Sequence, residues 1–154
     1  MDEKFVIASD HGGLALKEAI CTYLKEKGVE IDDLGTMTDD SVDYPDYGVK
    51  VARAVSTGVA DKGILICGTG IGMSIVANKF PGIRAALITD DFTARMSKEH
   101  NNANIIVMGG RILSADQARK MVQIWLEAVY EGGRHQKRLD KIANLEDDIR
   151  SGDL

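Results

Sequence analysis

The sequence has few cysteines and prolines, no long apolar run and no excess of positive charge, and each of these shortages excludes a class of protein. Its two cysteines lie far apart, with neither a Cys-x-x-Cys pair nor a metal-type spacing, which favours a reducing compartment over a disulfide framework. No apolar stretch approaches the roughly 20 residues that cross a bilayer. A net charge of −5 argues against non-specific binding to nucleic acid or a membrane. The first residues lack the pattern of a signal peptide, so we expect a cytosolic protein.

The remaining composition is that of an ordinary globular protein. With 154 residues, of which 44% are hydrophobic and 28% charged, the chain is long enough to bury a core. We expect residues 1–154 to form a single domain. Because the net charge is negative, an anionic ligand would have to be attracted by a local basic patch.

Short apolar segments alternate along the chain with segments whose apolar residues recur at helical spacing. This alternation is typical of βαβ units, which build a parallel sheet with right-handed crossovers. We therefore predict an α/β fold, a doubly wound, Rossmann-like parallel sheet of about five strands with helices on both faces, plus a C-terminal helix. The predicted strands are 5–8, 29–31, 63–67, 83–88 and 105–108. The predicted helices are 14–27, 47–57 (after Pro45, which excludes helix before it), one from about 73, 93–100 (capped by Asp91 or Thr93), 114–130, and one from about 134 with a frayed acidic end.

The segment 63–72 joins a buried strand to a glycine-rich turn and a helix start. Its first half is continuously apolar, and its second half alternates glycine with small residues. Backbone N–H groups at such a junction converge on one point and favour an anion. Cys67 lies where the strand ends, and a thiol beside this positive pole should be more reactive than a core cysteine. We expect an active site here, whereas Cys21, on an apolar helix, is expected to be a packed small hydrophobe.

A dinucleotide-binding loop is the alternative interpretation of these glycines. Gly68 and Gly70 fit the first two positions of Gly-x-Gly-x-x-Gly, and Asp90 follows about 20 residues further on. The third glycine arrives early, at Gly72, and Met73 occupies the position that needs close helix–strand packing. The match is only partial.

Two further polar positions stand at the ends of predicted elements. Asp10 and His11 follow the first strand, at the edge of the sheet where ligands bind in such folds. They could hold sugar hydroxyls or a phosphate; alternatively, Asp10 caps the next helix and His11 is a loop residue.

His100 lies between a predicted helix and a predicted strand, followed by a run rich in asparagine. It is either a histidine placed favourably on the helix dipole or a general acid/base, since imidazole titrates near neutral pH. A helix-to-strand turn lies at the opposite end of the sheet from the turns that carry Asp10 and Cys67. If His100 is catalytic, it must therefore reach that site from a neighbouring subunit across a dimer interface.

Arg134 and Arg138, four residues apart, share one face of the last predicted helix. Positive charges in the first turns oppose the helix dipole, and a phosphate bound there would turn this cost into a gain. The alternative is pairing with the acidic end of the chain or plain solvation. Arg111 could add to the patch.

Metal binding is poorly supported by the sequence. His11, His100 and His135 are scattered, and no His-x-x-x-His pair or carboxylate cluster of ligand spacing occurs. There is no Walker sequence and no Gly-x-Ser-x-Gly elbow.

Five motifs together resemble those of the type B ribose-5-phosphate isomerases, which form one sugar-phosphate isomerase family with the galactose-6-phosphate isomerase subunits. The motifs occur in the same order at similar spacing and cover nearly the whole chain. Together they are highly specific, although any one alone would not be. They are Ser9–Gly13, Asp43–Asp46, Ile66–Gly72, His100–Asn101 and Gly132–Arg138.

This resemblance implies the interconversion of ribose 5-phosphate and ribulose 5-phosphate, in the pentose phosphate pathway, without metal or organic cofactor. It implies that Cys67 is the base that moves a proton between C1 and C2 through a cis-enediolate. The Gly68–Gly72 loop, with Thr69, would donate hydrogen bonds to the enediolate, whereas the residues alone suggested a phosphate there. His100 would help to open the furanose ring. Some relatives use a glutamate base, but the corresponding position near Ser74 offers no carboxylate.

The resemblance also implies a substrate-binding set and an oligomer. His11, Arg134 and Arg138 would hold the phosphate, and Asp10 would position the sugar. Family members are dimers or tetramers in which the partner donates His100 and the arginines, so we expect a homodimer or homotetramer. The full implied substrate-binding set is Asp10, His11, Tyr44, Gly68, Thr69, Gly70, Ile71, Gly72, Asn101, Arg111, Arg134 and Arg138.

Two other functions remain open at this point. One is the same chemistry on a hexose 6-phosphate, such as allose 6-phosphate or galactose 6-phosphate, because one methylene is worth only about 1–3 kcal/mol of discrimination. The other is a non-catalytic nucleotide- or sugar-phosphate-binding module, suggested by the partial glycine fingerprint. Replacing Cys67 by alanine would separate an enzyme from a binding module.

Overall fold

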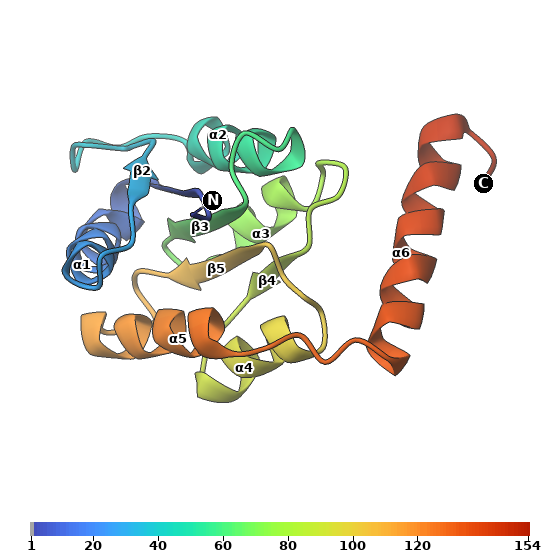
Figure 1. The fold of residues 1–154 in the computed structure, drawn as a ribbon. Helices are drawn as coiled ribbons and strands as arrows, with labels where there is room; N and C mark the ends of the chain where they lie inside the picture. The colour runs from blue at the N-terminus through green and yellow to red at the C-terminus, as the bar shows by residue number, and fades with distance from the viewer. Residues whose placement is uncertain (1) are drawn as a thin grey trace.

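Five parallel strands form one sheet in the order β2-β1-β3-β5-β4 (Figure 1). The computed structural model describes residues 2–154. The strand order reverses between β1 and β3, which makes their carboxyl ends the switch point where ligands bind in such sheets. The strands are β1 (Phe5–Ser9), β2 (Ile31–Asp33), β3 (Lys62–Cys67), β4 (Ala85–Leu87) and β5 (Ile105–Gly109).

Helices cover both faces of the sheet, as predicted. Along β1, Phe5 and Ile7 pack with α1, α4 and α5, whereas Val6 and Ala8 pack with α2 and α3. Both faces of the central strands are therefore buried, which explains why their sequences are continuously apolar. The helices are the 3-10 helix η1 (His11–Gly13), α1 (Leu14–Glu26), α2 (Tyr44–Ser56), α3 (Ile71–Ala77), α4 (Asp91–Glu99), α5 (Ala115–Glu127) and α6 (Arg134–Ser151).

Three predicted helix starts were late, among them that of α3, which begins at Ile71 rather than about residue 73. α2 begins at Tyr44, with Pro45 in its first turn, because the first turn has no intrahelical partner for the missing N–H and tolerates proline. α4 is capped by Asp90, whose side chain accepts from the Thr93 N–H at 2.7 Å, and the Thr93 hydroxyl accepts from the Asp90 N–H to complete a capping box.

Other observed boundaries also differ from the predicted ones. β2 pairs with β1 from Ile31 onward rather than from residue 29, and α5 ends at Glu127, since Ala128 is already extended. The C-terminal helix does not fray within its acidic segment. It continues to Ser151 and ends at Gly152, whose left-handed conformation (φ 79°) is that of a helix C-cap glycine.

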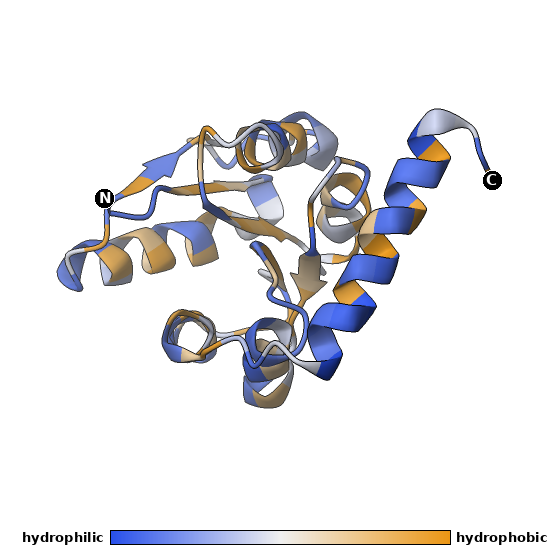
Figure 2. Cartoon of the chain, turned by 45° about the vertical axis from the view of Figure 1, so that its right-hand side comes forward, coloured by the Kyte–Doolittle hydropathy of each residue, from blue (hydrophilic) through white to orange (hydrophobic). Residues whose placement is uncertain are grey.

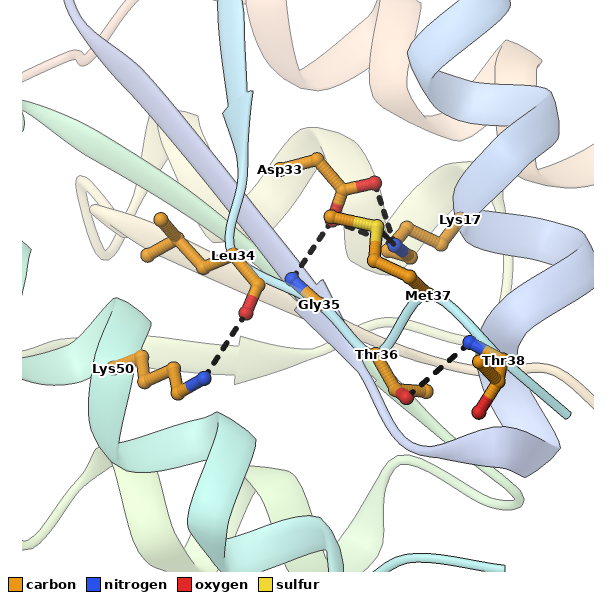
Figure 3. Close-up of polar contacts among 8 residues, drawn as sticks. All are labelled: Lys17, Asp33, Leu34, Gly35, Thr36, Met37, Thr38 and Lys50. Carbon is orange, nitrogen blue, oxygen red and sulfur yellow. Dashed lines mark hydrogen bonds and ion pairs between the residues drawn. The ribbon is translucent and has the colours of Figure 1, made fainter. Parts of the chain in front are cut away.

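A partly buried ion pair holds the end of β2 against α1 (Figure 3). The Lys17 side chain is fully buried and its Nζ lies 2.6 Å from Asp33 Oδ1. The same carboxylate accepts from the Gly35 N–H at 2.9 Å, and the Gly35 carbonyl accepts from the Ser9 N–H at 2.7 Å. The loop after β2 is thereby fixed beside the carboxyl end of β1.

The C-terminal helix α6 stands apart from the sheet, on the side away from the arrowheads of β3 and β5 (Figure 1). An apolar stripe runs along its length (Figure 2). Leu139 is buried near its start, whereas Ile142, Leu145 and Ile149 are exposed. No helix within residues 2–154 has the length and apolarity needed to cross a membrane.

Candidate active site

The thiol of Cys67 lies at the carboxyl end of β3, immediately under the glycine loop. The Gly70 N–H points at its Sγ, with a nitrogen–sulfur distance of 3.2 Å. Gly70 adopts a left-handed conformation (φ 83°) and is the N-cap of α3, a conformation that other residues rarely adopt. Cys67 itself is only 4% exposed, whereas Thr69 and Ile71 above it are exposed. The sulfur is thus a buried group beneath an exposed loop.

Three loops meet at this edge through their backbones. The Gly110 N–H donates to the Cys67 carbonyl at 2.8 Å, and the Arg111 N–H donates to the Gly68 carbonyl at 3.0 Å. A Cβ atom on Gly110 would lie 2.3 Å from the Gly12 carbonyl oxygen, and one on Gly12 would lie 3.4 Å from the Gly68 nitrogen. The loops after β1, β3 and β5 are therefore in contact without side chains between them, and this requires glycine.

Tyr44 and Arg111 frame the glycine loop. A Cβ on Gly72 would lie 2.5 Å from the Tyr44 ring, and one on Gly68 would lie 3.2 Å from Arg111 Nη1. A phenol and a guanidinium therefore flank a loop that also offers backbone N–H groups. This arrangement suits a small polar anion.

Asp10 and His11 complete the cluster at this edge. Asp10 is buried and its Oδ1 accepts from the Gly13 N–H at 3.1 Å, so it does cap the short helix η1, as the structural alternative required. His11 Nδ1 accepts from the Val42 N–H at 3.1 Å. Since Nδ1 is the acceptor, the Nε2 atom of a neutral His11 carries the proton and can donate it to a ligand. We call Asp10, His11, Tyr44, Cys67, Gly68–Gly72 and Arg111 the thiol cluster.

A second cluster lies where α4 ends and α6 begins. His100, Asn101, Arg134 and Arg138 line one cavity of about 260 Å³, together with His135, Leu139 and Ile142. Within residues 2–154 neither guanidinium makes an ion pair with the acidic end of the chain. Two guanidinium groups and an imidazole beside one hollow are an arrangement that suits a doubly charged anion. We call His100, Asn101, Arg134 and Arg138 the arginine cluster.

The loop that carries His100 is firmly held. Arg84 donates through Nε to the Asn101 carbonyl at 3.1 Å and through Nη2 to the Asn102 carbonyl at 3.0 Å. The buried Trp125 indole donates to the Ala103 carbonyl at 3.2 Å. The backbone beside His100 therefore has a defined position before any ligand binds.

The two clusters lie at opposite ends of the strands, the thiol cluster at the carboxyl ends and the arginine cluster near the amino ends. Gly109, at the carboxyl end of β5, pairs with Cys67, whereas His100 precedes the amino end of β5. At about 3.3 Å per residue, this five-residue strand alone separates them by roughly 15 Å. The predicted position of His100, at the far end of the sheet from Asp10 and Cys67, is confirmed. One sugar phosphate cannot contact both clusters of a single chain.

A separate hollow contains none of these residues. It measures about 720 Å³ and lies at the amino edge of the sheet, lined by Asp2, Glu3, Lys4, Phe5, Gly28, Val29, Glu30, Asp32, Val59 and Leu126. Four of these residues are acidic and one is basic, so the hollow repels an anionic substrate.

Cys21 is not part of either cluster. It packs against the core on the α1 side, as predicted. Burial raises the pKa of its thiol to about 11, and the negative charge of Asp33 acts in the same direction. Cys21 therefore stays a thiol at neutral pH and is a poor nucleophile.

The statement that the histidines are scattered was wrong for two of the three. His100 and His135 stack, with ring centroids 4.1 Å apart and an interplanar angle of 17°. His135 Nε2 also lies 3.2 Å from Glu131 Oε2. The Glu-x-x-x-His spacing could have indicated this second contact, but the stacking joins residues 35 positions apart and leaves no local signal.

Comparison with known proteins places the chain among sugar-phosphate isomerases. It matches the family model described as ribose/galactose isomerase over residues 5–142. It is 46% identical over 144 residues to ribose-5-phosphate isomerase B of Escherichia coli, covering 94% of this chain and 97% of that protein.

Two solved structures show the same fold over nearly the full chain. Ribose-5-phosphate isomerase B of Clostridium thermocellum has a TM-score of 0.92 and 53% identity, covering 95% of this chain and 99% of that one. The Mycoplasma genitalium enzyme of the same name, solved with bound ribulose-5-phosphate, has a TM-score of 0.91 and 43% identity, covering 94% and 97%.

The fold, the two clusters and these similarities define an aldose–ketose isomerase. The family model spans well over half of the residues. The chain belongs to the ribose/galactose isomerase family, and within it to the type B ribose-5-phosphate isomerases. The resemblance carried by the five sequence motifs is confirmed.

Proposed function

We propose that the protein interconverts ribose 5-phosphate and ribulose 5-phosphate at a site built from two copies of the chain. The observation that supports this most directly is the division of the chemistry between two edges of one sheet. The thiol cluster offers a base and N–H donors, and the arginine cluster offers a histidine and two guanidinium groups that form no ion pair within residues 2–154. A second copy that brings its arginine cluster to the thiol cluster completes the site.

The exposed stripe on α6 supports such an association. The arginines lie in the first turns of the same helix whose exposed residues Ile142, Leu145 and Ile149 form an apolar face. Docking this face on another copy would bury the apolar residues. It would also bring Arg134 and Arg138, which lie on the same helix, to that copy. Association is thus favoured by the hydrophobic effect, and the homodimer or homotetramer expected from the resemblance is part of this proposal. The proposal also includes a cytosolic location and a role in the pentose phosphate pathway.

In this proposal the thiolate of Cys67 removes the proton from C2 of the open-chain aldose and returns it to C1. The proton on O2 passes to O1, so that the aldehyde becomes an alcohol and C2 becomes a ketone without an external oxidant or reductant. Negative charge develops on the enediolate oxygens between these transfers. The N–H groups of the Gly68–Gly72 loop and the Thr69 hydroxyl would stabilise that charge.

The remaining residues would bind and prepare the sugar. His11, Arg134 and Arg138 would hold the phosphate, since guanidinium groups bind it through paired hydrogen bonds. Asp10, Tyr44, Asn101 and Arg111 would contact the sugar. His100 would open the furanose ring.

Replacement of Cys67 by alanine tests the base. Turnover of ribose 5-phosphate should fall at least about 10³-fold, while calorimetry should show ribulose 5-phosphate binding within a few-fold of wild type. Cys21→Ala is the matched control and should keep full turnover. Retained turnover in Cys67→Ala would refute the assignment, and a substrate panel with allose 6-phosphate and galactose 6-phosphate would identify a hexose enzyme.

Mixed dimers test the shared site. Cys67→Ala and His100→Asn chains are each inactive in the proposal, but a co-expressed mixture contains hybrids with one intact site. With random pairing, about a quarter of the wild-type activity should return. If the mixture stays inactive although hybrids form, the two clusters do not serve one site.

A further inference from the structure

The ring of His100 is held in an unusual way. Neither of its ring nitrogens takes part in a hydrogen bond within residues 2–154, so both are free for a ligand. Its side chain is held instead by stacking on His135, with centroids 4.1 Å apart. The orientation of His100 therefore depends on how well His135 is fixed.

His135 is fixed by Glu131. The His135 side chain is buried, with the residue 5% exposed, and its Nε2 lies 3.2 Å from Glu131 Oε2. An ionised carboxylate only accepts hydrogen bonds, so it selects the tautomer with the proton on Nε2. The Glu131 N–H in turn donates to the Glu99 carbonyl at 3.0 Å, in the last turn of α4 next to His100. The pair is thus anchored to the element that carries His100.

A divalent cation is the competing explanation for this group. The ligand atoms of His100, Glu131 and His135 all lie within 4.8 Å of one another. An imidazole binds a metal along its lone pair, in the plane of the ring, at about 2.0–2.1 Å for zinc. The two rings are stacked with only 17° between their planes, so a single ion cannot lie in both planes. The geometry favours orientation over chelation.

We propose that Glu131 and His135 are positioning residues that orient His100 for opening the sugar ring, a role that rests on the proposed function. Ring opening breaks the C1–O4 bond, forms the C1=O1 bond and moves one proton from O1 to O4. His100 takes the proton from O1 and gives it to O4, so the protein gains and loses none. While His100 carries the proton it faces the ring of His135, whose Nε2 is held by the Glu131 carboxylate.

Ring opening at His100 can be measured separately from proton transfer at Cys67 by comparing two reactions, the conversion of ribose 5-phosphate and the hydrogen exchange of ribulose 5-phosphate. Conversion of ribose 5-phosphate requires an opened ring. Ribulose 5-phosphate cannot form a five-membered ring because its O5 carries the phosphate, so it enters the site already open. Exchange of its C1 hydrogen with deuterium oxide, followed by NMR, reports the proton transfer at the thiol cluster alone.

The test compares His135→Ala, His135→Phe and Glu131→Gln with Glu127→Gln, an exposed glutamate near the end of α5. In His135→Ala, conversion of ribose 5-phosphate should fall about 10- to 100-fold, since small misplacements of a catalytic group cost rate on this scale. Hydrogen exchange should stay within about twofold of wild type. His135→Phe keeps a flat ring that can stack on His100, so its conversion rate should be higher than that of His135→Ala. The rate of Glu131→Gln should lie between those of wild type and His135→Ala. Glu127→Gln should convert ribose 5-phosphate at the wild-type rate. Because Glu131 is exposed, its variant tests the role even if His135→Ala unfolds.

The outcomes are distinguishable. Equal loss of both reactions in a folded Glu131 or His135 variant, or loss of neither, would overturn the positioning role. A conversion rate that a chelator removes and Zn²⁺ restores would replace it by a metal site. If Cys67→Ser keeps both reactions, or the wild type performs neither, the proposed function fails instead.

Discussion

Gly70 is the position where one methyl group should damage both the fold and the chemistry. Its φ of 83° lies in the left-handed region, and an added Cβ would lie 2.5 Å from Leu87 Cδ1 and 3.0 Å from the carbonyl carbon of Met108. The Leu87 side chain can move aside, but the Met108 carbonyl belongs to β5, which is paired with a strand on each side. Gly28 has a similar φ of 74° with nothing within 4 Å of its Cβ position, so Gly28→Ala is the matched control.

The magnitudes follow from these two sites. The left-handed conformation alone costs about 1–2 kcal/mol for alanine, which is the whole effect at Gly28. At Gly70 the overlap adds about 1–3 kcal/mol. For a chain of this length, we expect the melting midpoint to fall by about 5 °C in Gly28→Ala and by about 10 °C in Gly70→Ala, measured at equal protein concentration.

The catalytic consequence comes from the hydrogen bond between the Gly70 N–H and Cys67 Sγ. A backbone shift that relieves the overlap moves this N–H away from the sulfur and, in the proposed mechanism, from the enediolate. We expect kcat for ribose 5-phosphate to fall about 10²-fold, the lower end of the loss for one oxyanion donor, while Gly28→Ala keeps wild-type kcat. Equal melting midpoints in the two variants, with kcat for Gly70→Ala within threefold of wild type, would refute this reasoning.

Three further predictions concern stability and assembly. Lys17→Met leaves the partly buried Asp33 carboxylate without its cation and should lower the free energy of unfolding by about 3 kcal/mol in urea titration; a loss below about 1 kcal/mol would contradict the importance of the pair. Leu145→Asp places a charge in the apolar stripe of α6, which is the proposed subunit contact, and should shift light scattering toward the mass of a monomer with loss of turnover and unchanged helicity; an active oligomer would show that another surface mediates assembly. Because the pKa of Cys21 is raised from 9.0 to about 11, its contribution to stability is complete below pH 9 and is lost as the pH rises toward 11. After discounting for its partial exposure this amounts to about 1 kcal/mol, and Cys21→Ala should flatten that part of the pH profile; an unchanged slope would place the titration elsewhere.

The architecture could be predicted because the local signals agreed with the global fold. Buried strands covered on both faces are continuously apolar, and amphipathic helices alternate with them. The errors lay at boundaries set by single hydrogen bonds. The prediction excluded Pro45 from helix α2, although the first turn of a helix tolerates proline. It also did not assign Asp90 as the cap of α4, although Thr93 follows at the spacing of a capping box.

One part of the candidate site could be predicted from the sequence and another could not. Placement of His100 at the far edge from Cys67 followed from chain direction alone, since successive parallel strands run the same way. The stack of His100 on His135 could not be predicted, because it depends on the path of the linker between α5 and α6. The linker already meets the end of α4 at Glu131, whose N–H donates to the Glu99 carbonyl, and Gly132 and Gly133 follow with positive φ. No periodicity in the sequence gives this path.

The backbone contact between the loops after β1 and β5 has a consequence for the length of sugar that fits. Where Gly110 meets the Gly12 carbonyl, the contact is made by backbone atoms, and there is no side chain that a substitution could shorten. In the proposed shared site, a sixth carbon would therefore have to be accommodated on the side of the second copy, where α6 is proposed to dock. Engineering for hexose phosphates should therefore begin with the subunit contact, and the glycine loops should be left as they are.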